Sequence, residues 1–257
     1  MVARFAVLDA PLPLAIAHRG GASSWPENTM PAFQGAVDLG FRFLETDVHC
    51  TADGVLVAFH DDRLDRVTDR TGLICELPYA EVAKALVDGL EPIPLFEDLL
   101  RAFPDVRFNI DPKADDAVEP LARVLQQADA IDRVCVGAFS DARLERIRHL
   151  CGPGLCTSLG PKKVMQLLAA SKPGIGKVLR PRFVEGAAQV PHRAKGVTVV
   201  TQGFVDTAHH LGLQVHVWTI DDPVEMHQLL DLGVDGVMTD QPAVLKGVLQ
   251  ARGVWAG

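Results

Sequence analysis

The chain has 257 residues, of which 48% are hydrophobic and 23% charged, a composition that excludes wholesale disorder and indicates a globular protein with a sizeable core. Its formal net charge of -8 argues against nucleic-acid binding, because that binding depends on clustered Lys and Arg side chains. The length is close to the roughly 250 residues of one eight-stranded α/β barrel. We therefore predict a single domain over residues 1–257.

The sequence contains no feature typical of a secreted or membrane protein. The apolar stretch near its start is interrupted by Asp9 and by prolines, so no signal peptide is predicted. No run approaches the roughly 20 apolar residues that span a bilayer. The cysteines are an odd number without CxxC spacing, which favours reduced thiols. We expect a cytoplasmic protein without a transmembrane segment, and the sequence does not indicate its oligomeric state.

Short apolar runs alternate along the chain with helical stretches, a pattern typical of βα units and a parallel sheet. The first predicted helix follows Asn28 and Thr29, either of which is a suitable N-cap, and ends before Gly40. Helices after Ser140 and after Asp221 or Asp222 have the same start and stop chemistry. The eight predicted strands are Leu14–Ala17, Phe43–Val48, Arg107–Ile110, Arg133–Ala138, Gly154–Ser158, Gly196–Val200, Gln214–Thr219 and Val234–Met238.

Two intervals between the predicted strands are longer than a regular βα unit, which needs about 30 residues. The first runs from Val48 to Arg107, where we predict an insertion over residues 50–106 on the mouth of the barrel. The second contains the stretch Lys172–Lys195, which we predict to be a loop that shapes a substrate pocket. The elements predicted within the insertion are a strand over Val55–Phe59 and helices over Tyr79–Val87 and Leu95–Phe103.

The second predicted strand carries two carboxylates on one face. Side chains alternate along a strand, so Glu45, Asp47 and His49 point one way while Thr46 and Val48 point the other. In a dry barrel interior the acids would repel each other unless a cation compensated them. Residues two apart on a strand are only about 7 Å apart, so both carboxylates can bind one hard ion such as Mg²⁺ or Ca²⁺. An exposed edge strand with solvated acids is the alternative.

Two histidines follow apolar runs at strand ends, where parallel barrels build their active sites. His18 comes directly after the first strand and precedes Arg19, whose planar fork matches phosphate oxygens. The alternative for His18 is a buried histidine in an ordinary βα turn. His60 ends the insertion's predicted strand, and Asp61 beside it either orients the imidazole or caps a turn. Two histidines suit phosphodiester cleavage, because one deprotonates the nucleophile while the other protonates the leaving alkoxide.

A third carboxylate and a lysine follow the third predicted strand. Asp111 precedes Pro112, and such a pair is commonly a solvated turn. Because two other carboxylates already stand at an end of the same barrel, we interpret Asp111 as a further metal ligand. Lys113 adds a second cation beside it.

These residues, in this order, resemble the glycerophosphodiester phosphodiesterase family. The matches span nearly the whole chain, and their combination is specific although each one alone is weak. The matching stretches are His18–Gly21 with Pro26–Thr29, Glu45–His49, His60–Asp61 with Leu64–Thr68, Ile93–Leu100, Phe108–Lys113, Val215–Thr219 and Gly233–Pro242.

The resemblance implies a TIM (β/α)8 barrel with a small insertion after the second strand and one divalent cation, Mg²⁺ or Ca²⁺. It also implies hydrolysis of glycerophosphodiesters to sn-glycerol 3-phosphate and an alcohol. The family's third metal ligand is usually a glutamate, whereas this chain has Asp111, one methylene shorter. The roles implied are catalysis for His18, His60 and Arg19, metal ligation for Glu45, Asp47 and Asp111, and substrate binding for Arg19, Lys113 and Trp218.

Residues near these motifs have weaker predicted roles. Trp218 lies at the end of an apolar strand, where an aromatic side chain is usually part of the core. Glu27 is predicted to cap a helix or to join a supporting polar network near the site. Asp240 is predicted to organise the loop after the last strand.

Two other functions stay open at this point. A lysophospholipase D on the same barrel needs an exposed apolar rim for an acyl chain, which Phe183, Val184 and Val190 would supply. A non-catalytic, phosphodiester-binding barrel would lack a histidine or a metal ligand, and only Asp111 departs from the family's pattern.

Overall fold

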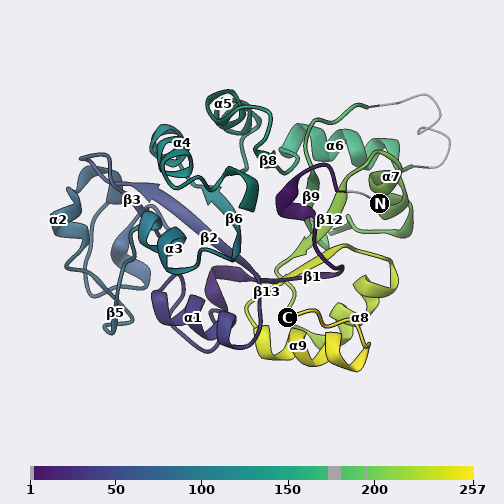
Figure 1. Cartoon of the computed structure of the whole chain (residues 1–257), viewed down its shortest axis with the longest axis horizontal. Helices are drawn as coiled ribbons and strands as arrows, with labels where there is room; N and C mark the ends of the chain where they lie inside the picture. Colours follow the sequence, from purple (N-terminus) through teal and green to yellow (C-terminus); the bar gives the residue numbers. More distant parts are fainter. Residues whose placement is uncertain (1–2, 173–180, 195) are drawn as a thin grey trace.

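The computed structural model describes residues 3–172, 181–194 and 196–257, which form a nearly closed α/β barrel (Figure 1). Parallel strands pair in the order β8-β7-β6-β2-β1-β13-β12-β9. A parallel bridge between Ser158 and Ala187 joins the two end strands and nearly closes the ring. These strands are β1 (Leu14–Ala17), β2 (Phe43–Cys50), β6 (Arg107–Pro112), β7 (Val134–Val136), β8 (Cys156–Thr157), β9 (Ala187–Pro191), β12 (Gln214–Trp218) and β13 (Gly236–Thr239).

A helix follows each barrel strand and lies on the outside of the sheet (Figure 1), so the predicted α/β barrel is confirmed. Helices begin at predicted caps: the side chain of Ser140 accepts a hydrogen bond from the backbone of Arg143, and Asp222 accepts from Val224. The helices are α1 (Met30–Asp38), α3 (Phe96–Ala102), α4 (Val118–Gln127), α5 (Asp141–Cys151), α6 (Pro161–Ala170), α7 (Gln202–His210), α8 (Pro223–Asp231) and α9 (Pro242–Ala251).

Strand alternation decides which side chains face the barrel's interior. In β2, Leu44 packs into the main core with the surrounding helices, whereas Phe43 packs with a second cluster inside the barrel. Residues 7–8, which precede β1, belong to that second cluster and close the amino-terminal end of the barrel with apolar side chains. Glu45 and Asp47 share the inward face of Phe43, nearer the carboxyl ends of the strands.

The insertion after β2 has a hydrophobic cluster of its own and lies to the left in Figure 1. It begins with β3 (Leu56–Ala58), which pairs antiparallel with β2. The helix predicted over Tyr79–Val87 is wrong beyond α2 (Tyr79–Val82), because β4 (Leu86–Val87) pairs with β5 (Glu91–Pro92). Asp88 and Gly89 between them have positive φ angles of 53° and 70°, which turn the chain back into this hairpin.

The helix predicted over Leu95–Phe103 is present as α3, but its place in the fold differs from the prediction. Phe96 and Leu99 pack in the main core, together with Phe108 of β6. This helix is therefore the barrel helix that follows the second strand, and the residues that pack separately lie before it.

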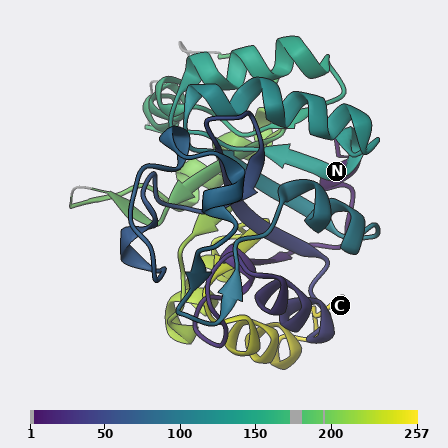
Figure 2. The same ribbon diagram turned by 90° about the vertical axis from the view of Figure 1, so that its left-hand side faces the viewer.

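The prediction of Gly196–Val200 as a barrel strand is wrong, because only Val197–Thr198 within it forms a strand and that strand lies outside the barrel sheet. The sixth barrel strand is β9, which lies within the stretch predicted to be a loop and pairs in parallel with β12. The residues after it form the hairpin of β10 (Arg193–Ala194) and β11 (Val197–Thr198), which projects to the left in Figure 2. Val197 is 55% exposed, so this β-branched run lies outside the core. Residues 173–180 and 195 of the predicted loop are outside the described residues.

Candidate active site

His18 and Arg19 follow β1 in a tight 3-10 turn over His18–Gly20. Arg19 has a φ angle of 51° and Gly20 one of 81°, both in the left-handed region. A Cβ atom on Gly20 would come within 2.8 Å of the backbone of Ala32 and of Phe33 in α1. Glycine here lets the turn pack directly against α1, which holds both functional side chains at the end of the strand.

His18 is held between two carboxylates. Its Nδ1 atom lies 2.8 Å from Oδ1 of Asp240, and its Nε2 atom lies 3.8 Å from Oε2 of Glu45. Burial lowers the pKa of His18, but the charges of Glu45 and Asp240 outweigh this effect and raise the pKa above its ordinary value. The sequence interpretation gave Asp240 a role only in its loop, because nothing local to the last strand indicates that it contacts a residue near the start of the chain.

His60 has the same arrangement on the insertion side of the site. Its Nδ1 atom lies 2.6 Å from Oδ1 of Asp61, so of the two predicted roles for Asp61 the orienting contact is the one observed. His49 does not reach the carboxylates of its own strand face; its Nε2 atom lies 3.1 Å from the backbone oxygen of His60. Both loops thus present an imidazole whose Nδ1 atom is engaged by a carboxylate.

Arg19 is also part of a polar network. Its Nη1 atom donates to Oε1 of Glu27 at 3.1 Å, and its Nε atom lies 3.2 Å from Oδ2 of Asp47. The contact with Arg19 places Glu27 in the polar network that was one of its two predicted roles. The backbone N–H of Arg19 donates to Oε2 of Glu45 at 3.1 Å, so this one residue contacts both acids of β2.

The acids of β2 are buried and differ in charge compensation. Glu45 and Asp47 are 5% and 1% exposed. Burial and the neighbouring charge of Asp47 raise the pKa of Glu45 to about 7. Burial also acts to raise the pKa of Asp47, but the charges of Lys113 and Arg19 outweigh it and lower that pKa. Glu45 is therefore the acid whose negative charge is least compensated by the side chains around it.

Asp111 stands opposite Asp47 in the β2–β6 register, so the two carboxylates emerge side by side. Nζ of Lys113 lies between them, 2.7 Å from Oδ1 of Asp47 and 2.8 Å from Oδ2 of Asp111. The other oxygen of Asp111, Oδ1, is buried and has no hydrogen-bond partner among the described residues. Burial raises the pKa of Asp111 despite the lysine.

The donor set fits a hard divalent cation, although the described residues contain no cluster of three His, Cys, Asp or Glu side chains gathered closely enough to hold an ion. Glu45, Asp47 and Asp111 carry three negative charges when ionised, and Arg19 and Lys113 carry two positive charges. A divalent cation would turn the remaining negative charge into a positive one, which a phosphodiester anion would neutralise. The unpartnered Oδ1 of Asp111 is a ready oxygen ligand.

Trp218 lies at the carboxyl end of β12, where it is half-buried. Its ring contacts that of Phe139 edge to face, with centroids 5.7 Å apart, and Phe139 is 70% exposed on the loop after β7. Sequence reasoning missed Phe139, because a single aromatic residue in a polar turn carries no pattern. His216, on the same strand, is fully buried, and its two ring nitrogens contact Gln189 and Gln214.

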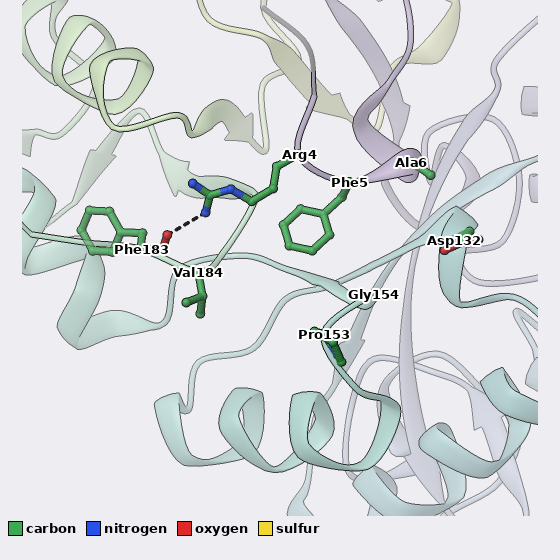
Figure 3. Close-up of a pocket in the computed structure, with 8 residues that line it drawn as sticks. All are labelled: Arg4, Phe5, Ala6, Asp132, Pro153, Gly154, Phe183 and Val184. Carbon is green, nitrogen blue, oxygen red and sulfur yellow. Dashed lines mark hydrogen bonds between the residues drawn. The ribbon is translucent and has the colours of Figure 1, made fainter.

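The apolar rim expected from Phe183, Val184 and Val190 does not stand at the mouth of the barrel. Val190 is 1% exposed in the core. Phe183 and Val184 precede β9 and line a cavity of about 510 Å³ with Arg4 and Phe5 at the amino-terminal end of the barrel (Figure 3). There, Nη1 of Arg4 donates to the backbone oxygen of Phe183 at 2.6 Å. This cavity lies at the opposite end of the strands from the histidines.

Comparison with known proteins shows the family to which this chain belongs. A model of the Glycerophosphoryl diester phosphodiesterase family matches residues 18–244. The protein named Probable glycerophosphodiester phosphodiesterase 2 of Mycobacterium tuberculosis is 42% identical over 247 residues, covering 95% of this chain and 93% of that protein. The chain belongs to the glycerophosphodiester phosphodiesterase family. It is therefore an enzyme that hydrolyses phosphodiesters.

Solved structures of other proteins share the fold. A crystal structure from Silicibacter pomeroyi has a TM-score of 0.81 at 23% identity and covers 98% of this chain and 100% of that one. An Oleispira antarctica phosphodiesterase, solved with sn-glycerol-3-phosphate, has a TM-score of 0.78 at 24% identity and covers 93% of this chain and 97% of that one. Among the described residues of the present chain, no helix has the length and apolar character of a membrane span.

Proposed function

We propose that the protein hydrolyses glycerophosphodiesters to sn-glycerol 3-phosphate and an alcohol, with His18 and His60 as the acid/base pair and a divalent cation held by carboxylates. The two imidazoles are the main support for this activity, since each has a carboxylate 2.6–2.8 Å from Nδ1, which leaves Nε2 for proton transfer. The sn-glycerol-3-phosphate bound to the Oleispira antarctica protein matches the product proposed here.

Each displacement at phosphorus requires two proton transfers. One imidazole takes a proton from the attacking oxygen, which is either a water molecule or the glycerol 2-hydroxyl group, as this oxygen forms its bond to phosphorus. Attack by water gives sn-glycerol 3-phosphate directly, whereas attack by the hydroxyl group gives a cyclic phosphate that a water molecule then opens in a second displacement. The other imidazole donates a proton to the alcohol oxygen as its bond to phosphorus breaks. Asp240 and Asp61 keep each ring in a fixed orientation and stabilise its protonated form.

Arg19 and Lys113 are proposed to hold the phosphoryl oxygens. Arginine offers two parallel N–H groups that match a phosphate, and lysine adds a point charge. Both cations already lie against Asp47, at 3.2 Å and 2.7 Å, so they stand beside the proposed metal ligands. Preorganised positive charge at this place stabilises the negative charge that builds on the phosphoryl oxygens in the transition state.

Glu45, Asp47 and Asp111 are the proposed ligands of Mg²⁺ or Ca²⁺. When bound, the ion would act as a Lewis acid on a phosphoryl oxygen. The raised pKa of Glu45, about 7, and the unpartnered oxygen of Asp111 both support a cation at this place. The side chain of Asp111 is one methylene shorter than that of the family's usual glutamate, and metal preference is the property that this difference would affect.

The two alternative functions have less support. The residues expected to form an acyl-binding rim for a lysophospholipase D lie in the core or at the far end of the barrel. A non-catalytic barrel would not need two imidazoles that are each oriented by a carboxylate, which is the arrangement present at His18 and His60.

Release of sn-glycerol 3-phosphate from glycerophosphocholine, measured with and without EDTA, tests the proposal. EDTA should abolish turnover and added Mg²⁺ or Ca²⁺ should restore it. His18→Ala and His60→Ala should each lower kcat by about 10²–10⁴-fold, the usual contribution of a general acid or base. His210→Ala, on the exposed end of α7, is the matched control and should be unaffected. Near-normal turnover by either active-site variant would overturn the acid/base assignment, and turnover in EDTA would overturn metal dependence.

A further inference from the structure

Arg66 belongs to the matched stretch Leu64–Thr68, and neither the proposed acid/base pair nor the metal ligands account for it. It ends a 3-10 turn in the insertion. Its guanidinium group makes two forked contacts with two different carboxylates. Nε donates to Oδ2 of Asp61 at 2.6 Å and Nη2 to Oδ1 at 2.9 Å. On the second fork, Nη1 donates to Oε2 of Glu27 at 3.2 Å and Nη2 to Oε1 at 2.7 Å.

Each of these carboxylates in turn holds a residue of the proposed site. Asp61 contacts Nδ1 of His60 at 2.6 Å, and Glu27 accepts from Nη1 of Arg19 at 3.1 Å. Arg66 is therefore one contact away from both a proposed acid/base group and a proposed phosphate-binding group. These two groups come from different segments, since His60 lies in the insertion and Arg19 in the turn after β1.

The insertion needs such a connection because, apart from Leu56 and Ala58 of β3, most of its buried apolar residues form a cluster separate from the main core. Its position relative to the turn after β1 is therefore set partly by polar contacts. The contact between Arg66 and Glu27 joins residues 39 positions apart in the sequence and links these two segments directly. Movement of the insertion without this contact would change the distance between His60 and Arg19.

We propose that Arg66 is a positioning residue that fixes His60, through Asp61, and Arg19, through Glu27, in one geometry around the substrate phosphodiester. This inference rests on the proposed function, because it assumes the roles given there to His60 and Arg19. The planar guanidinium group makes paired N–H contacts with each of two carboxylates, a forked geometry that the ammonium group of lysine cannot form. The hydrogen bonds from Arg66 also hold the pKa of Asp61 well below its ordinary value, so Asp61 stays an anion toward His60.

If Arg66 had a purely structural role, its removal would lower the stability of the fold and not selectively the turnover. The side chain of Arg66 is 47% exposed, and exposed ion pairs contribute little to the stability of a fold. Removal of Arg66 should therefore affect turnover far more than folding. Residues that support catalytic groups from behind typically change activity by about 10–100-fold when they are removed.

The test compares Arg66→Ala and Arg66→Lys with Arg63→Ala. Arg63 is a matched control, because it is 48% exposed in the same segment and pairs only with Asp65, at 3.2 Å, among the described residues. With glycerophosphocholine as substrate, Arg66→Ala should lower kcat by about 10–100-fold and raise KM, and Arg66→Lys should be intermediate. Added guanidinium chloride at millimolar concentration should restore part of the activity of Arg66→Ala, whereas sodium chloride at equal concentration should not. Arg63→Ala should stay within about twofold of the wild type.

A triple variant, compared with its double-variant background, shows whether Arg66 acts through the two carboxylates. In a background of Asp61→Asn with Glu27→Gln, Arg66→Ala should have little further effect, because the groups it acts on are already uncharged. A full, multiplicative loss in that background would overturn the inference. So would an Arg66→Ala variant with kcat and KM within about twofold of the wild type, or one whose loss is matched by Arg63→Ala.

Parallel assays of His60→Ala and Arg19→Ala separate this inference from the proposed function. If both lose activity while Arg66→Ala does not, the positioning role alone is wrong. If either keeps its activity, the proposed function itself fails. Thermal unfolding of each variant identifies any that do not fold, and Arg66→Lys, which keeps the charge and most of the side-chain length, then provides the test.

Discussion

Replacement of Lys113 by methionine would remove the cation that lies between two buried acids. Asp47 and Asp111 have side chains 1% and 12% exposed, and Nζ of Lys113 contacts both. Asp47 would keep Arg19 and Asn28, each at 3.2 Å. Asp111 would lose the one partner it has among the described residues, since its other oxygen has none. The destabilisation should therefore fall mainly on Asp111.

The size of the effect has an upper limit, because Asp111 can take up a proton instead of remaining an unpaired buried anion. Protonation costs about 1.4 kcal/mol for each pH unit above the ordinary pKa, which is 3.8 for this side chain. The limit is therefore about 6 kcal/mol at pH 8 and about 1.6 kcal/mol at pH 5. Breaking a buried ion pair commonly costs about 3–5 kcal/mol, so we expect about 3 kcal/mol at pH 8.

The pH dependence has a definite sign. Burial already raises the pKa of Asp111 in the folded protein, and loss of Lys113 raises it further. A carboxyl group whose pKa is raised by folding destabilises the folded state as pH increases through that pKa, while below its ordinary pKa this penalty is absent. Lys113→Met should therefore be much closer to the wild type at pH 5 than at pH 8.

Urea and thermal unfolding in EDTA measure this directly. A loss of about 3 kcal/mol corresponds to a decrease in Tm of about 6–12 °C for a chain of this size. Lys84→Met is the control, because Lys84 forms an exposed pair with Glu81 and should change stability by no more than about 0.5 kcal/mol. Added Ca²⁺ or Mg²⁺ should recover stability in Lys113→Met by binding the released carboxylates. Equal Tm values for Lys113→Met and Lys84→Met at pH 8 in EDTA would refute the reasoning.

Two further changes test the turn after β1 and its partner. Gly20→Ala should destabilise the fold by about 1–3 kcal/mol or more, because it forces alanine to a φ angle of 81° and against the backbone of Ala32 and Phe33. Urea unfolding measures this loss of stability. An unchanged midpoint would contradict the close packing of the turn against α1. Asp240→Asn should lower kcat by about 10–100-fold with a smaller effect on KM, because the amide no longer stabilises protonated His18 at Nδ1. Steady-state kinetics with glycerophosphocholine measure both constants. A normal kcat would exclude the role of Asp240 in stabilising His18.

The local sequence was sufficient to predict which side chains the strands and their ends place in the site. The alternation of side chains predicted that Glu45 and Asp47 share one face, and the structure places both inside the barrel, with Asp47 opposite Asp111. Apolar runs before His18 and His60 predicted that strands or their ends present both imidazoles. The physical reason is that period-two alternation and strand boundaries depend on neighbouring residues alone.

Contacts between distant segments could not be predicted in this way. Asp240 lies 222 positions from His18, and Phe139 meets Trp218 across the mouth of the barrel. Arg66 reaches Glu27 only because the insertion folds back over the turn after β1. The motifs contained most of these residues, but their spacing did not indicate which would touch.

The sixth barrel strand shows most clearly what the sequence determined and what only the tertiary structure decided. By itself, the sequence determined the number of βα units, the caps of several helices and the identity of the polar residues at the strand ends. It favoured the β-branched run at Val197–Val200 as a strand, whereas the chain uses Ala187–Pro191, whose small residues have low strand propensity. Only the tertiary structure decided this, because strand formation depends on pairing and burial. β9 pairs along its whole length with β12, and its alanines are completely buried against neighbouring elements of the barrel.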